Sequence, residues 1–167
     1  MSNGTILISP YAQKLRNGKE NPKNFPYWGS LVNKMIDCGF DVIQIGSSKD
    51  SKIDYGMITH HDHLGTFSFK SNLKLKEIVD LVEKCNTWIS VDSFLPHLNH
   101  YYSRKPGIVI FSQSDPRIFG YNENNNLLKD RKYLRENMFW LWEQATYDAD
   151  AFVSAEEVVV EVKRLLA

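Results

Sequence analysis

The sequence predicts an α/β protein in which helices cover a mostly parallel sheet. Short apolar runs rich in β-branched residues alternate with longer segments whose apolar residues recur at helical spacing, and this alternation is typical of α/β sandwiches. The first segments read strand, helix, strand, which favours a parallel pair joined by a right-handed crossover. The chain has 167 residues, 43% of them apolar, so we expect residues 1–167 to form a single domain with a real core.

The N-terminal half contains one strand–helix–strand unit. Pro26 opens its helical pattern, because proline is well tolerated in the first turn of a helix. Gly39 stands just after the pattern, where a C-terminal cap is expected. The expected elements are, in order, a strand over 5–9, a polar loop over 11–24, a helix from Pro26 to just before Gly39, a strand over 41–45, and an exit turn at Gly46, Ser47 and Ser48.

The C-terminal half continues the alternation after an unclear stretch. Residues 47–73 give no firm pattern except a short possible strand over 56–59. Ser154 and Glu157 have the spacing of a capping box and predict the start of the last helix. The remaining expected elements are a helix from Lys74, a strand over 87–91, a short helix over 96–103, a strand over 107–111, a loop with Pro116, Gly120 and an asparagine run, and a helix ending at Leu166.

Composition excludes several function classes. Twenty basic and twenty acidic side chains cancel, so the chain has no general attraction to nucleic acids or anionic membranes. Cys38 and Cys85 are far apart and have no metal-like spacing, which indicates buried thiols in a reducing compartment. No apolar run has the length of a signal peptide core or a membrane span. We therefore expect a cytoplasmic protein with no membrane partner.

Asp92, Ser93 and His97 follow directly on a buried-looking strand. In one interpretation Asp92 or Ser93 caps the next helix and His97 lies on its surface. In the other, the helix N-terminus faces an anion, with Ser93 and backbone N–H groups gripping a phosphate and His97 neutralising it. Asp92 would then accept a hydrogen bond from a sugar hydroxyl. Both can hold together, because ligands of parallel sheets bind outside the carboxyl ends of the strands.

The loop after Ser9 carries four cations, Lys14, Arg16, Lys19 and Lys23. Surface loops are where lysines usually lie, so a solvated loop is the simpler interpretation. These cations nevertheless lie between a strand end and a helix start, where a phosphate site would need them. Of these residues we take Ser9, Arg16, Lys19 and Lys23 as candidates for binding a substrate.

Two further clusters have simpler explanations. His60, His61 and His63 resemble the His-x-His-x-Asp-His metal motif of metallo-β-lactamase-type hydrolases, but the spacing is compressed and no partner set completes a site. We therefore expect a polar loop and no metal. The aromatic side chains of Phe139, Trp140 and Trp142 are expected in the core or at an interface, where they would cover a partner.

The order of "KNFPYW", "IGS", "ISVDSFLPHL" and "IVIFSQSDP" resembles the C-terminal half of the heptosyltransferase family, glycosyltransferase family nine. Lys23 and Pro26 match that family's Lys-x-Trp-Pro motif, with Phe25 in place of tryptophan. The segment from Asp92 to Leu98 matches Asp-(Thr/Ser)-Gly-x-x-His-Leu, with Phe94 in place of glycine. Ser112 replaces a glycine after the following strand. The likeness covers about residues 5 to 120.

This resemblance implies a three-layer sandwich with a Rossmann-like, mostly parallel sheet, which is one half of a GT-B fold. It also implies that the domain binds a nucleoside-diphosphate sugar and needs no metal or other cofactor. It implies that Lys23 contacts the diphosphate, that Asp92, Ser93 and His97 hold the sugar and phosphates, and that the Gly46–Ser47 turn with Asp50 approaches the ribose. By this resemblance the chain looks like the donor-binding domain alone, whereas the usual catalytic carboxylate of the family lies on its acceptor-binding domain. Asp92 and Asp115 are the candidate catalytic bases, or a second copy or separate subunit supplies one.

Three functions remain open at this point. The first is a glycosyltransferase completed by a partner, whose acceptor is a lipopolysaccharide-type sugar, a nucleotide or a modified nucleic-acid base. The second is a non-catalytic subunit that binds a nucleotide sugar. The third is a metal hydrolase that uses His60 to His63.

Overall fold

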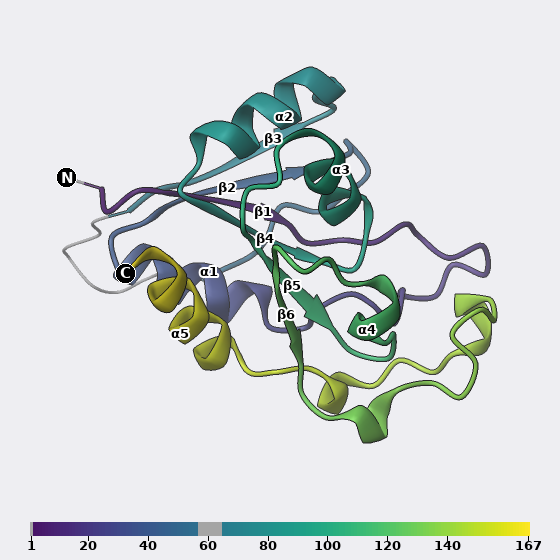
Figure 1. Cartoon of the computed structure of the whole chain (residues 1–167). Coiled ribbons are helices and arrows are strands. Elements are labelled where there is room, and N and C mark those ends of the chain that lie inside the picture. The colour runs from purple at the N-terminus through teal and green to yellow at the C-terminus, as the bar shows by residue number, and fades with distance from the viewer. Residues whose placement is uncertain (1, 57–64) are drawn as a thin grey trace.

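A computed structural model of the chain describes residues 2–56 and 65–167 (Figure 1). The described residues form one six-stranded sheet in which all neighbouring strands are parallel. Across the sheet the strands are β3 Phe67–Ser71, β2 Asp41–Gly46, β1 Thr5–Ser9, β4 Thr87–Val91, β5 Ile108–Phe111 and β6 Asn125–Leu128. This strand order is that of Rossmann sheets, which confirms the expected α/β class.

Helices cover both faces of the sheet. On one face α1 packs beside α5, and on the other α2 packs beside α3 (Figure 1). The helices are α1 Trp28–Asp37, α2 Leu75–Lys84, α3 Phe94–Tyr102, α4 Pro116–Phe119 and α5 Ala155–Leu166, with 3-10 turns η1 Arg131–Tyr133, η2 Trp142–Gln144 and η3 Ala149–Ala151. The expected three-layer sandwich is confirmed. Within the described residues, no helix combines the length and apolar character that a membrane span requires.

The central strands are buried on both faces because each face carries a helical layer. Along β1, Ile6 and Ile8 pack into the layer of α1 and α5, whereas Leu7 packs into the layer of α2 and α3. All three side chains are fully buried. Trp28 of α1 fills the first layer and Trp88 of β4 fills the second. Burial on both sides explains why these strands are continuous apolar runs in the sequence.

The C-terminal cap predicted at Gly39 is confirmed. Gly39 has a left-handed φ of +83°. Its N–H donates to the carbonyl of Ile36 at 2.8 Å, and the N–H of Phe40 donates to the carbonyl of Met35 at 3.0 Å. These two bonds make a Schellman motif, in which glycine is favoured because it has no Cβ. The turn leads the chain directly into β2, beside β1.

The sequence pattern does not reveal the two edge strands. β3 lies in the stretch without a clear pattern, and β6 lies in the asparagine-rich loop. Their residues are only partly buried or exposed, so their apolar signal is weak, and asparagine is uncommon in strands.

The helix expected from Pro96 begins two residues earlier, at Phe94. Pro96 therefore occupies the first turn of α3. Proline is tolerated there because the N–H groups of a first turn have no partner within the helix.

Candidate functional site

A cleft of ≈ 1250 Å³ opens at the carboxyl ends of the strands. It lies beside the junction of β1 and β4, where the strand order reverses and open α/β sheets bind ligands. Figure 1 shows the loop after β1 and the segment before η3 extending beyond the same edge of the sheet. The residues expected from the sequence that line the cleft are Ser9, Arg16, Lys23, Gly46, Ser47, Asp50, Asp92 and Ser93.

A buried carboxylate and a lysine meet in this cleft. The Nζ atom of Lys23 lies 3.5 Å from Oδ2 of Asp92. Ser114, which follows β5, donates its hydroxyl to the same oxygen at 2.8 Å. Asp92 is only 6% exposed, so the hydrogen bond from Ser114 and the ammonium group of Lys23 take the place of part of the water around its carboxylate.

The loop that carries Lys23 is held at several points. The N–H of Lys23 donates to the side chain of Asn21 at 3.0 Å. Ser112, directly after β5, donates its hydroxyl to the carbonyl of Pro22 at 3.0 Å. Trp28 donates its indole N–H to the carbonyl of Pro10 at 3.1 Å, which joins the start of α1 to the end of β1. The lysine therefore comes from a backbone fixed against the ends of two strands.

The start of α3 forms another part of the wall. Ser93 is the residue before the helix, but its side chain makes no capping hydrogen bond to α3. Its hydroxyl lies 3.3 Å from that of Ser90, and both Ser93 and Phe94 line the cleft. The side-chain cap considered from the sequence is therefore not formed. The first N–H groups of α3 adjoin the cleft, as an anion site at a helix N-terminus requires.

The turn after β2 presents a carboxylate to the cleft. Oδ2 of Asp50 accepts a hydrogen bond from the N–H of Ser47 at 2.7 Å. A methyl group at Gly46 would lie 2.6 Å from the same oxygen, so glycine permits this close approach. Burial, together with the charges of Asp50 and Glu20, raises the pKa of the nearby Tyr11.

Residues 134–146, which we call the strap, close the cleft on the side of the basic loop. Trp140, Trp142 and Glu143 of the strap line the cleft. The N–H of Arg16 donates to Oε1 of Glu143 at 3.2 Å, so the strap and the loop after β1 touch. Hydrogen bonds from its own backbone N–H and from that of Arg16 lower the pKa of Glu143.

The aromatic residues of the strap are not in the core, contrary to one of the two placements that we expected. Phe139 is 81% exposed and Trp140 is 55% exposed. Trp142 is partly buried, in the 3-10 turn η2. Apolar residues in this segment follow no helical or strand period, so the segment does not form an element that could bury them.

Three expected site residues do not line the cleft: Lys19, His97 and Asp115. Lys19 is exposed on the loop. His97 is an exposed residue of α3, and its Nδ1 atom lies 2.7 Å from the hydroxyl of Tyr121. The sequence interpretation required His97 and Lys23 to line one cavity. In the structure only Lys23 lines the cleft.

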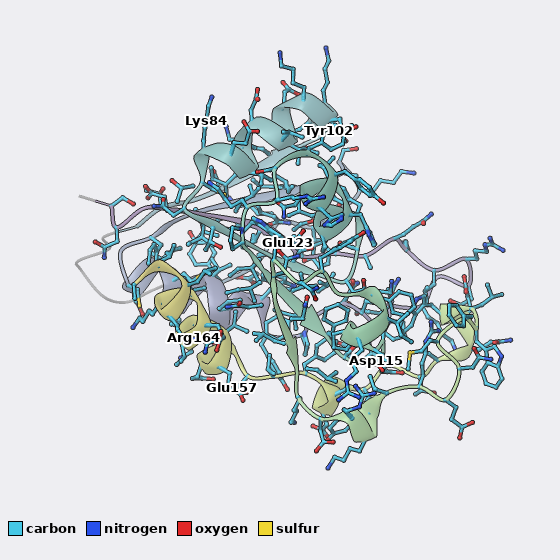
Figure 2. All side chains as sticks on the ribbon, in the orientation of Figure 1. Lys84, Tyr102, Asp115, Glu123, Glu157 and Arg164 are labelled. Atoms are coloured by element: carbon cyan, nitrogen blue, oxygen red, sulfur yellow. The ribbon has the colours of Figure 1, made fainter. Side chains whose placement is uncertain are left out.

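Asp115, a candidate base in the sequence and labelled in Figure 2, has a structural role. It caps α4 by accepting the N–H of Arg117 at 2.9 Å. It also binds the guanidinium of Arg131 through both oxygens, at 3.0 and 2.7 Å. The hydrogen bonds from Arg131 hold the pKa of Asp115 below its ordinary value, and a lowered pKa makes a weaker base.

The histidine cluster lies outside the described residues, since His60, His61 and His63 all fall between residues 56 and 65. Most of the possible strand over 56–59 falls there too. In the part of the chain that the structure describes, no three His, Cys, Asp or Glu side chains are grouped to hold a metal ion.

A known protein family matches most of the sequence. Residues 1–137 match the profile of glycosyltransferase family 9 (heptosyltransferase). The chain belongs to glycosyltransferase family 9. The family resemblance inferred from the motifs around Lys23 and Asp92 is thus confirmed, whereas the roles of individual residues stay predictions. No curated protein matches the sequence significantly.

Solved structures share the fold of this family 9 chain. The glycosyl transferase family 9 structure from Veillonella parvula DSM 2008 aligns with 97% of the chain and 45% of its own length, with a TM-score of 0.70 and 15% identity. The E. coli heptosyltransferase WaaC with ADP aligns with 98% of the chain and 44% of its own length, with a TM-score of 0.60 and 13% identity. The chain spans less than half the length of either protein.

The sequence analysis did not single out two side chains that contact Asp92 and Lys23, those of Ser114 and Trp142. Ser114 follows the strand next to β4, and that position at a carboxyl end was a usable signal. Trp142 contacts Lys23 because the strap folds back over the basic loop, and no local sequence pattern predicts that fold.

Proposed function

We propose that this chain binds the nucleoside-diphosphate sugar of a glycosyltransferase and takes part in transferring the sugar to an acceptor. The observation that carries the proposal is the pair of Lys23 and Asp92 in the cleft, beside the uncapped start of α3. Membership of glycosyltransferase family 9 supports the reaction class. The positions of Ser9, Ser47 and Asp50 along the wall support a nucleoside and sugar as the rest of the ligand.

The diphosphate is proposed to lie between Lys23 and the first turn of α3. The ammonium group, the hydroxyl of Ser93 and the helix N–H groups all favour negative charge there. In the transfer step an acceptor hydroxyl attacks the anomeric carbon, and the bond from this carbon to the phosphate oxygen breaks. The electron pair leaves with the nucleoside diphosphate. Fixed positive groups stabilise that charge, so we propose that no metal ion is needed.

The acceptor proton needs a base, and neither carboxylate suggested by the sequence is well placed to take it. Asp92 is paired with Lys23 and Ser114, and Asp115 is paired with Arg131. Oδ2 of Asp92 is thus already in contact with two partners, and the hydrogen bonds from Arg131 hold the pKa of Asp115 below its ordinary value, which makes Asp115 a weaker base. We propose that Asp92 orients Lys23 and accepts a sugar hydroxyl. The base and the surface that binds the acceptor would be supplied by a second lobe, a second copy of the chain or a separate subunit.

Calorimetric titration with ADP, GDP, UDP and CDP, with and without EDTA, tests the binding proposal. ADP belongs in the panel because the WaaC structure contains it. We expect at least one of these compounds to bind in the presence of EDTA. Lys23→Met should weaken that binding about tenfold or more, because a charged contact to the phosphates is lost.

Lys19→Met is the matched control, because Lys19 lies in the same loop but does not line the cleft. It should change the affinity less than about twofold. Equal losses in both variants, or no binding by the wild type, would contradict the proposal. Release of nucleoside diphosphate from sugar donors on addition of an acceptor separates a transferase from a non-catalytic binding subunit.

A further inference from the structure

Two cations lie over the indole ring of Trp142. The guanidinium carbon of Arg135 is 3.7 Å from the ring centroid, and Nζ of Lys23 is 5.0 Å from it. The ring quadrupole attracts cations at such distances. Because Lys23 also lies 3.5 Å from Asp92, its ammonium group is held from two sides, by a carboxylate and by an aromatic ring.

The strap that carries Trp142 is fastened at both ends to one residue. The N–H of Arg135 donates to the carbonyl of Gln113 at 3.0 Å. The side chain of Gln113 in turn donates to the carbonyl of Thr146 at 2.7 Å. Just beyond the strap, the hydroxyl of Tyr147 donates to the carbonyl of Asn24, next to Lys23, at 2.9 Å. The ring of Trp142 thus comes from a closed loop that is anchored beside the lysine.

We propose that Trp142 is a positioning residue that holds the ammonium group of Lys23 at the cleft for the donor diphosphate. This inference rests on the proposed function, because it assumes that Lys23 binds the phosphates. Trp142 lies beyond residue 137, where the family match ends, so the motifs of the family did not point to it.

The physical reason is preorganisation. A lysine side chain has four rotatable carbon bonds, and fixing them on binding opposes association. A ring that already holds the ammonium group removes part of this cost before the ligand arrives. The same contact makes a base-stacking role for Trp142 unfavourable, because its ring is already in contact with Arg135 and Lys23.

The test is a double-mutant cycle on nucleoside-diphosphate affinity, measured by calorimetry with the compound that binds the wild type. Trp142→Leu removes the ring and should weaken binding roughly five- to tenfold. Trp142→Phe keeps an aromatic face and should restore most of the affinity. In a Lys23→Met background, Trp142→Leu should cause no further loss, because the residue acts through the lysine.

Phe139→Leu is the matched control, since Phe139 is an exposed aromatic residue of the same strap that does not line the cleft. It should leave the affinity unchanged. If Trp142→Leu does not fold, fluorinated tryptophan incorporated at position 142 keeps the shape and weakens the attraction for cations. Affinity should then fall with each added fluorine.

The outcomes separate the two proposals. If Lys23→Met weakens binding but Trp142→Leu or the fluorinated series does not, the role of Trp142 is wrong and the proposed function stands. If the loss from Trp142→Leu persists in the Lys23→Met background, Trp142 acts on the ligand directly and the inference is overturned. If the wild type binds no nucleoside diphosphate, the proposed function fails first.

Discussion

At the level of single residues, partners decide which carboxylates are free to act. Asp115 follows β5 at the carboxyl edge of the sheet, which made it a candidate base. Both of its oxygens bind Arg131, however, and one of them also caps α4. Asp50 accepts a hydrogen bond from the N–H of Ser47 through one oxygen and lines the cleft. Position in the sequence places a carboxylate at the edge, and its neighbours determine its chemistry.

Arg131→Met should raise the pKa of Asp115 toward its ordinary value, because the hydrogen bonds that favour the charged form are lost. Because the pKa of Asp115 is lower in the folded than in the unfolded protein, the carboxylate stabilises the fold at pH values above its ordinary pKa. This stabilisation is lost as the pH falls through the folded-state pKa. The variant should therefore be less stable than the wild type at neutral pH, and the difference should shrink in acid. An NMR titration of Asp115 and chemical unfolding at several pH values measure both effects.

The ion pair of Arg164 and Glu161 on α5, whose arginine is exposed, provides the comparison. Arg164→Met should change the free energy of unfolding by less than about 1 kcal/mol, because surface ion pairs contribute little. A pKa of Asp115 that does not move in Arg131→Met would show that the capping bond alone holds it.

Among the elements, the start of β5 depends on a close contact with β4. Trp88 is fully buried, and its indole N–H donates to the carbonyl of Lys105 at 3.0 Å. A Cβ atom at Gly107 would overlap this ring, so a side chain there cannot be placed without moving the tryptophan or the strand. Glycine is required here by close approach and not by its φ angle.

Gly107→Ala should lower the free energy of unfolding by roughly 1–3 kcal/mol, as overpacking of a core does. Denaturant unfolding measures the loss. In a Trp88→Phe background the same substitution should cost less, because the smaller ring leaves room for the methyl group. Equal costs in the two backgrounds would place the strain in the backbone of β5 and not at the ring.

At the level of the whole molecule, the cleft joins segments that are far apart in the chain. Its walls come from the loop after β1, the turn after β2, the start of α3 and the strap. A ligand that contacts all of them is lost on unfolding, so its binding energy adds to the stability of the entire fold.

Saturating nucleoside diphosphate should therefore raise the Tm. At a ligand concentration of 100 Kd the stabilisation is about 2.7 kcal/mol, which corresponds to roughly 5–10 °C for a chain of this size. The matching nucleoside without phosphates should give a much smaller shift, and Lys23→Met should reduce the shift with the diphosphate. An equal shift with the nucleoside would mean that the phosphates contribute nothing and that Lys23 does not bind them.

Much of the fold could be predicted from the amino-acid sequence. The four central strands, the helices between them, the glycine cap after α1 and the capping box at Ser154 all followed from local patterns. Such patterns are local because burial on a sheet or a helix repeats with a fixed period along the chain. The motifs around Lys23 and Asp92 also placed the chain in its family, which the profile match confirmed.

Packing settled what these patterns do not contain. The edge strands β3 and β6 are recognised only by their pairing, because half-exposed residues carry little apolar signal. Three contacts join residues that are 16 to 119 positions apart in the sequence. They are the contacts of His97 with Tyr121, of Asp115 with Arg131 and of Trp142 with Lys23. Contacts of this kind depend on how loops cross in space, and no periodicity along a single chain encodes such a crossing.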